Sequence, residues 1–87
     1  MKLTSSEKKI LSLLIYPETF NQLLEETGLQ KGLLRDDLMN LVSHRYVEVY
    51  EKDGSRPVSP FYDSDHLELF AFKATKSGLN AIQGYAV

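Results

Sequence analysis

Apolar residues in the first half of the chain recur every three or four positions, which is the period of a helix with one buried face. They predict three helices, at about residues 5–16, 20–27 and 31–45. The first two predicted helices are each preceded by a threonine followed three positions later by Glu or Gln, as in a capping box. Pro17 ends the first helix and Gly28 caps the second in the left-handed conformation. The residues of these two predicted capping boxes are Thr4 with Glu7 and Thr19 with Gln22.

After position 45 the apolar period changes from 3.6 to 2. Residues 46–51 and 67–73 predict two strands of a hairpin, and 76–84 predict a last helix capped by Thr75. The connection between the strands contains Gly54, Pro57 and Pro60. At about fifteen residues it is long for a hairpin, which suggests either a functional loop or disorder at its tip.

This order of elements predicts an α+β fold, the winged helix, in which three helices with a helix-turn-helix precede a β-hairpin wing and a C-terminal helix. Segment 27–47, TGLQKGLLRDDLMNLVSHRYV, resembles the turn and recognition helix of MarR- and ArsR-type transcriptional regulators, T-G-L-S-x-S-T-V-S-R-x-L-x-x-L-x-x-x-G-L-V. Segments 3–11 and 72–79 resemble the first helix and the strand-to-helix joint of the same proteins. The resemblance implies a single winged-helix domain over residues 1–87 that binds DNA and regulates transcription.

The composition and the absence of known motifs exclude several classes of function. The chain has 87 residues, no cysteine and a net charge of −2, which fits one small domain and excludes disulfides, a thiol nucleophile and cysteine-based metal sites. The first residues turn polar where a signal peptide is apolar, and no apolar run approaches the length of a membrane span, so we expect a cytoplasmic protein. Because no catalytic or phosphate-binding motif is visible, we expect no enzyme and no cofactor. Asp63, Asp65 and His66 are close in sequence, but we expect an acidic loop rather than a metal site.

Double-stranded DNA is the first expected partner. The third helix would lie in the major groove and the wing on the backbone, and a homodimer would double the phosphate contacts. Positive charge must then come from local side chains, because the whole chain is slightly acidic. The expected nucleic-acid-binding residues are Gln30, Lys31, Arg35, Asn40, Lys52 and Arg56.

A protein partner is the alternative. The helical period places Gly32, Leu33, Asp36, Asn40 and Ser43 on the outer face of the third helix. DNA-binding relatives usually have hydroxyl or basic side chains there, and neighbouring carboxylates would oppose a polyanion. A winged helix used for protein recognition could instead contact its partner through this face and clasp it with Pro57, Pro60 and Phe61 of the wing. The expected protein-contact residues are Leu33, Asp36, Asp37 and Met39.

Overall fold

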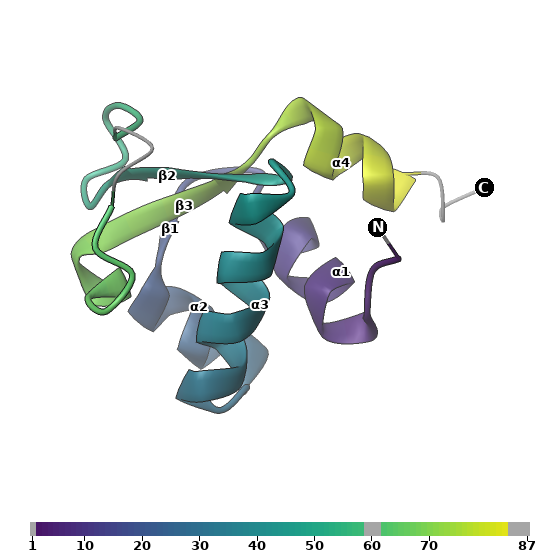
Figure 1. The fold of residues 1–87 in the computed structure, drawn as a ribbon, viewed down its shortest axis with the longest axis horizontal. Helices are drawn as coiled ribbons and strands as arrows, with labels where there is room; N and C mark the ends of the chain where they lie inside the picture. The colour runs from purple at the N-terminus through teal and green to yellow at the C-terminus, as the bar shows by residue number, and fades with distance from the viewer. Residues whose placement is uncertain (1, 59–61, 84–87) are drawn as a thin grey trace.

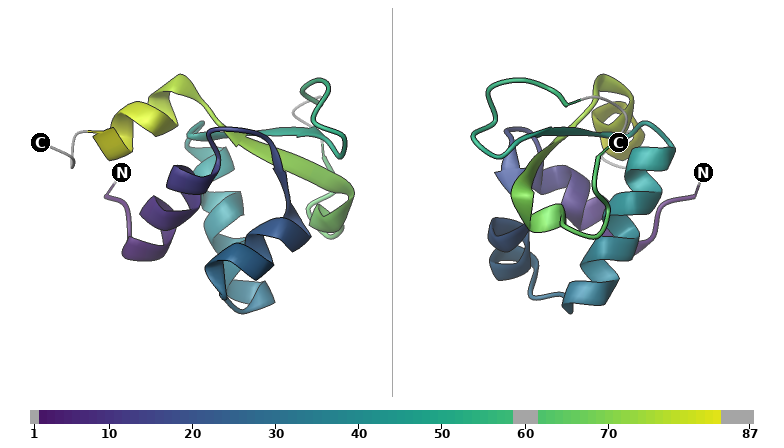
Figure 2. Two further views of the ribbon diagram at one scale, coloured as in Figure 1. Left: turned by 180° about the vertical axis from the view of Figure 1, so that it is seen from behind. Right: turned by 60° about the vertical axis from the view of Figure 1, so that its left-hand side comes forward.

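The computed structural model describes residues 2–58 and 62–83, and Pro60, Phe61 and Gly84 lie outside this range. Within these two ranges, the fold has four α-helices, a short 3-10 helix and a three-stranded antiparallel sheet of order β1-β3-β2 (Figure 1). Figure 2 shows from two further sides that α4 lies over α1, at the opposite end from the β2–β3 loop. The fold class predicted from the sequence is confirmed. In chain order the elements are α1 (Ser5–Leu13), β1 (Glu18–Thr19), α2 (Phe20–Thr27), α3 (Lys31–Ser43), β2 (Val47–Glu51), the 3-10 helix η1 (Leu67–Leu69), β3 (Phe70–Ala74) and α4 (Lys76–Gln83).

Both predicted capping boxes are present. The Glu7 amide donates to Thr4 Oγ1 at 3.1 Å, and the Thr4 amide donates to Glu7 Oε1 at 2.9 Å. Thr19 and Gln22 make the same reciprocal pair at the start of α2, at 3.2 and 2.8 Å. Gly28 ends α2 with a φ of 69°, as the sequence predicts. These local signals therefore position the first two helices.

Helix α1 is shorter than the prediction of 5–16, because it ends at Leu13. The Ala74 amide of β3 donates to the carbonyl of Leu14 at 2.9 Å, and the chain then enters β1, which the sequence did not predict. Ile15, an apolar residue within the predicted range of this helix, is consequently 55% exposed. A strand of two residues shows no alternation of its own, and its partner β3 lies about fifty residues later.

Helix α3 ends at Ser43, two residues before the predicted end. Arg45 takes the left-handed conformation with a φ of 61°. The Arg45 amide donates to the carbonyl of Val42 at 3.0 Å, and the Tyr46 amide to the carbonyl of Leu41 at 2.9 Å. This pattern of bonds is that of a Schellman motif, with arginine in the position that glycine usually occupies.

The second predicted strand begins later than expected, because residues 67–69 form η1 and β3 starts at Phe70. β2 pairs with β3 from Val47 opposite Ala74 to Glu51 opposite Phe70. Part of the long connection also has regular structure. Tyr50 forms an antiparallel bridge with Pro57, so the chain turns back along β2 before it reaches η1. The predicted last helix is confirmed as α4 within the described residues, and the Gly78 amide donates to its predicted cap Thr75 at 3.0 Å.

The core lies between the sheet and the first three helices. The predicted apolar stripe of α3 is buried, since Leu34, Leu38 and Leu41 are inaccessible to solvent. They pack in one cluster with apolar residues of α1, α2, β2 and β3, among them Ile10, Leu11, Leu14, Phe20, Leu23, Val47, Val49 and Phe72. The opposite side of α3 is therefore directed away from this core.

Glu18 in β1 makes the stability of the fold depend on pH. Its Oε2 is buried without a hydrogen-bond partner among the described residues. The pKa of Glu18 is raised from 4.5 to about 7, mainly by burial and to a smaller extent by a hydrogen bond to Glu26 of α2 and by the charge of Glu26. The unfolded chain loses this proton near its ordinary pKa, whereas the folded chain holds it to higher pH.

We therefore expect the free energy of unfolding to fall as the pH rises from about 4.5 to about 7. Glu18→Gln should remove most of this fall, because an amide does not ionise. Thermal unfolding followed by circular dichroism across this range measures the effect, with Glu25→Gln on the exposed side of α2 as the control. An unchanged pH profile for Glu18→Gln would show that the folded chain does not retain the proton of Glu18.

Candidate nucleic-acid interface

The N-terminal half of α3 presents a mostly uncharged outer face. Gly32, Leu33 and Asp36 are exposed, as the helical period predicts. The Leu33 side chain has an unusual exposure for a large apolar residue, at 46%, and the side chain of Asp36 is 75% exposed. Neither side chain is covered by another element, so both remain available to a base edge or to a protein partner.

Asp37 and Asn40 are directed to the N-terminus of α1. Asn40 Nδ2 donates to Glu7 Oε2 at 2.8 Å, and Ser6 Oγ donates to Asp37 Oδ2 at 2.6 Å. Glu7 is only 2% exposed, and its other carboxylate oxygen belongs to the capping box of α1. The Asn40 amide supplies a donor that the buried Glu7 carboxylate needs, and Asp37 accepts from Ser6, so both residues join α3 to α1. Sequence reasoning missed this role, since Thr4 and Glu7 carry a signal for a cap but none for a contact with α3.

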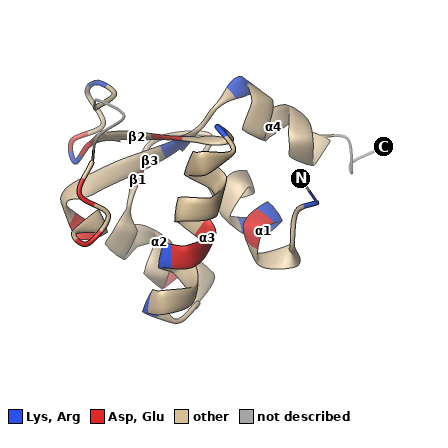
Figure 3. Cartoon of the chain, in the orientation of Figure 1, with Lys and Arg blue, Asp and Glu red and all other residues tan. Residues whose placement is uncertain are grey.

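Arg35 joins α3 to the loop before η1. Its guanidinium lies 3.6 Å from Asp36 Oδ1 and 3.7 Å from Asp65 Oδ1, and its Nε donates to the carbonyl of Ser64 at 3.4 Å. A phosphate would therefore compete with two carboxylates for this side chain, which is 41% exposed. Figure 3 shows the acidic stretch of this loop at the left of the molecule, below the basic residues of the wing.

The cation at the start of α3 is placed differently. Gln30 is the N-cap residue, makes no side-chain capping bond and is exposed together with Lys31. The first amides of a helix have no partner within the helix and attract anions. Lys31, the first residue of α3, therefore adds its charge to a helix end that already favours phosphate.

The two cations of the wing lie on a turn that bends towards β1. The Gly54 amide donates to the carbonyl of Glu51 at 2.7 Å, and Gly54 has a φ of 74°. A Cβ atom on Gly54 would lie 3.1 Å from Cβ of Pro17, so the turn is packed against the segment before β1. Lys52 is exposed, whereas Arg56 lies 3.3 Å from Glu51 Oε1. Arg56 must leave this carboxylate to reach a phosphate.

Both histidines of the chain lie within hydrogen-bond distance of other residues of the chain. His44 caps α3 and its Nδ1 lies 2.9 Å from the carbonyl oxygen of Asn40. His66 Nδ1 lies 2.6 Å from Asp63 Oδ2, and this hydrogen bond raises the pKa of His66 and lowers that of Asp63.

No cluster of three or more metal-binding side chains occurs in residues 2–58 and 62–83. None of the helices in these ranges has the length and apolar character that crossing a membrane requires.

Comparison with solved structures identifies similar folds. A mutant of Lactococcus lactis ZitR superposes with a TM-score of 0.73 at 16% identity over 99% of this chain. The adhesin competence repressor AdcR of Streptococcus pyogenes gives 0.72 at 16% identity over 98%. Both are regulators of the MarR family. The chain has a MarR-type winged-helix fold. The resemblance that the sequence suggested is thereby confirmed.

The chain spans about half the length of these structures, 52% of ZitR and 55% of AdcR. No protein-family model matches the sequence, and no curated protein matches it. In the winged-helix frame, α3 is the helix that follows the helix-turn-helix turn, and the segment between β2 and β3 is the wing. The exposed first turns of α3 and its N-cap therefore carry one group of predicted contact residues, namely Gln30, Lys31, Leu33 and Asp36. The wing carries a second group, Lys52 and Arg56.

Proposed function

We propose that this chain binds double-stranded DNA through α3 and acts in transcriptional regulation. The observation that carries this proposal is the MarR-type fold with the N-terminal end of α3 uncovered and Lys31 at that end. An α-helix fits the major groove, and free amides at a helix start bind phosphate. Gln30 and Lys31 would contact the backbone where the helix enters the groove.

Leu33 and Asp36 would then face the bases. An apolar side chain can contact the methyl group of thymine, and a carboxylate can accept a hydrogen bond from the amino group of cytosine. Gly32 adds no side chain between them and the duplex. Arg35 and Asn40 would hold α3 in position, because the first binds the loop before η1 and the second binds Glu7. Lys52 and Arg56 would contact the backbone from the wing, and a second copy of the chain would double all of these contacts.

Lys31→Ala tests this placement. We expect weaker binding to all duplex sequences and a salt dependence whose log–log slope is smaller by about one, because one phosphate contact is lost. Fluorescence anisotropy of a labelled random duplex of about 30 base pairs, from roughly 20 to 200 mM salt, measures both quantities. Lys2→Ala is the matched control, since it removes the same charge from the segment before α1.

Equal effects of the two substitutions would argue against docking through α3. Absence of binding by the unchanged protein at the lowest salt would overturn the proposal. The exposed Leu33 beside Asp36 favours the second candidate in that case, a protein partner on the same face. Asp37 and Met39 would contribute less to such a contact than the sequence predicts, because Asp37 accepts a bond from Ser6 and Met39 packs partly against the core.

A further inference from the structure

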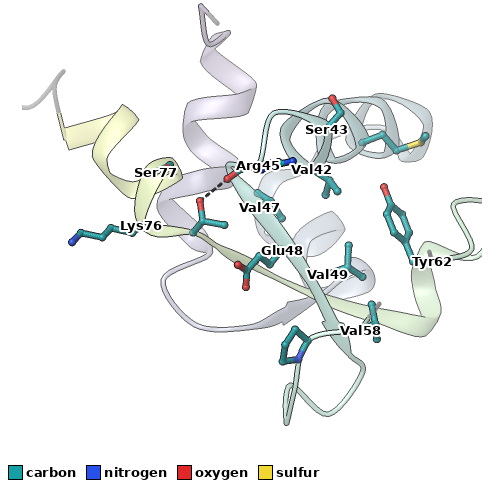
Figure 4. Close-up of a pocket in the computed structure, with 13 residues that line it drawn as sticks. Val42, Ser43, Arg45, Val47, Glu48, Val49, Val58, Tyr62, Lys76 and Ser77 are labelled. Carbon is teal, nitrogen blue, oxygen red and sulfur yellow. Dashed lines mark hydrogen bonds between the residues drawn. The ribbon is translucent and has the colours of Figure 1, made fainter. Parts of the chain in front are cut away.

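The segment that leads into η1 lies along one side of α3. Tyr62 at its start lines a pocket together with Met39 and Val42 of α3, and Figure 4 shows the Tyr62 side chain directed towards this helix. The Tyr62 ring also packs edge-on against Phe70 of β3, with ring centroids 6.2 Å apart. The segment is therefore held between α3 and β3 at the point where the next residues begin a turn.

Residues 63–66, here called the acidic turn, are organised by the carboxylate of Asp63. Its Oδ1 accepts a hydrogen bond from the Asp65 amide at 3.0 Å, and its Oδ2 lies 2.6 Å from His66 Nδ1. The His66 amide donates to the Asp63 carbonyl at 3.0 Å. An aspartate that bonds the amide two residues later forms an Asx turn. This turn uses the carboxylate of Asp63 internally and leaves that of Asp65 to α3.

The acidic turn covers Arg35 with anionic and carbonyl oxygens. The Arg35 Nε donates to the Ser64 carbonyl at 3.4 Å, and its guanidinium lies 3.7 Å from Asp65 Oδ1 and 3.6 Å from Asp36 Oδ1. The side chains of Asp65 and Asp36 are 81% and 75% exposed. Ion pairs between exposed groups contribute little to stability. A phosphate, which binds a guanidinium through two parallel hydrogen bonds, is therefore able to replace these partners.

The joint between α3 and α1 shows the contrast. Asn40 Nδ2 donates to Glu7 at 2.8 Å, and Glu7 is only 2% exposed. Loss of that bond would leave a buried carboxylate without one of its donors, which is costly. The carboxylate of Asp65 stays in water whether or not Arg35 contacts it. Of these two contacts of α3, the one made by Arg35 is the one that an external anion can displace.

The sequence around the turn adds negative charge. Asp63, Asp65 and Glu68 are the ionisable residues of segment 62–69 besides His66. Carboxylates that face a polyanion oppose its approach, because like charges then lie side by side. The turn therefore acts against DNA in two ways, since it occupies a cation of α3 and places further carboxylates beside it.

We propose that the acidic turn is an autoinhibitory contact, which holds Arg35 in the free chain and releases it to a phosphate when α3 enters the major groove. This inference rests on the DNA binding proposed above and adds a control of its strength. On binding, Arg35 exchanges the Ser64 carbonyl and the Asp65 carboxylate for the DNA backbone. The exchange costs free energy at every duplex sequence. The turn thus suppresses binding to duplexes that offer α3 no favourable base contacts.

Asp65→Asn tests the contact, because asparagine keeps the shape of the side chain and removes its charge. We expect the affinity for the random duplex to rise about threefold at low salt, the size expected for an exposed ion pair. The log–log salt dependence should steepen by about 0.9, since the released Arg35 adds one phosphate contact. Glu48→Gln is the matched control, because it removes the same charge from an exposed position of β2. A gain no larger than that of Glu48→Gln would overturn the proposal.

The same two substitutions in an Arg35→Gln background separate release of Arg35 from a change of net charge. Without the guanidinium, Asp65→Asn should gain no more affinity than Glu48→Gln does. A gain that persists in this background would overturn the proposal, because the carboxylate would then act without Arg35. Weaker binding of Asp65→Asn in the unchanged background would overturn it as well, since the turn would then position Arg35 for DNA.

A measurement without DNA distinguishes failure of this inference from failure of the proposed function. In the free chain the Nε proton of Arg35 should exchange with solvent more slowly than that of Arg45, which makes no ion pair among the described residues. Asp65→Asn should narrow this difference. Equal exchange of the two protons would show that the turn does not hold Arg35, even if the chain binds DNA. The expected exchange without duplex binding by any variant would show that the contact exists but inhibits nothing, and both proposals would fail.

Discussion

Gly78→Ala should lower the free energy of unfolding by about 3 kcal/mol or more, because the added Cβ atom would overlap the backbone of Tyr46. A Cβ at Gly78 would lie 2.1 Å from the carbonyl oxygen of Tyr46 and 3.1 Å from Cδ2 of Leu11. The Tyr46 oxygen cannot withdraw easily, since it accepts a hydrogen bond from the Thr75 amide at 3.0 Å. The helix α4 must therefore move away from β2 and α1, or the substitution must strain the joint between β3 and α4.

Thermal unfolding measures this effect. For a domain of this size we expect the midpoint to fall by roughly 15 °C. Gly32→Ala is the matched control, because nothing lies within 4 Å of the corresponding Cβ position on α3. Alanine there should leave the stability unchanged or raise it by up to about 1 kcal/mol, since it favours helix. A fall of less than about 1 kcal/mol for Gly78→Ala would mean that α4 does not pack on Tyr46 as closely as the structure shows.

The elements that the sequence predicts correctly depend on neighbouring residues. The two capping boxes join residues three positions apart, and the buried stripe of α3 repeats within one helix. A local pattern is sufficient in both cases because the interacting groups are close in the chain. The same argument explains why β1 was missed. Its two residues form a strand only because they pair with the edge of β3, and no residue near Glu18 in the sequence indicates this pairing.

The candidate interface was predicted less completely for a similar reason. The helical period alone predicts that the side of α3 opposite to Leu38 is exposed to solvent, and it places Asn40 on that side. The N-terminus of α1 reaches this side, so Asn40 bonds to a residue that precedes it by thirty-three positions. Arg35 likewise pairs with Asp65, which follows it by thirty. Exposure along one helix can be predicted from its period, but the partners that other elements bring to it cannot.

Asp36→Lys should strengthen binding to a random duplex about tenfold at low salt. If α3 lies in the major groove, the highly exposed carboxylate of Asp36 faces the base edges between two phosphate backbones, whose negative charge opposes it, and the longer side chain of a lysine there can reach a phosphate. Each added contact steepens the log–log salt dependence by about 0.9. The substitution also removes one of the carboxylates that hold Arg35 on α3, which leaves this cation freer to contact phosphate.

Anisotropy with the random duplex measures both the affinity and the slope. The double variant Asn80→Lys with Gln83→Lys is the matched control, because it changes the net charge by the same amount on exposed positions of α4, away from the start of α3 (Figure 1). If the control gains as much as Asp36→Lys, net charge rather than docking through α3 accounts for the effect. A variant that gains affinity for the random duplex but loses discrimination between sequences would show that Asp36 reads a base, as a carboxylate does when it accepts from cytosine. Unchanged affinity would mean that Asp36 does not face the duplex, and the exposed side of α3 would then be a surface for a protein.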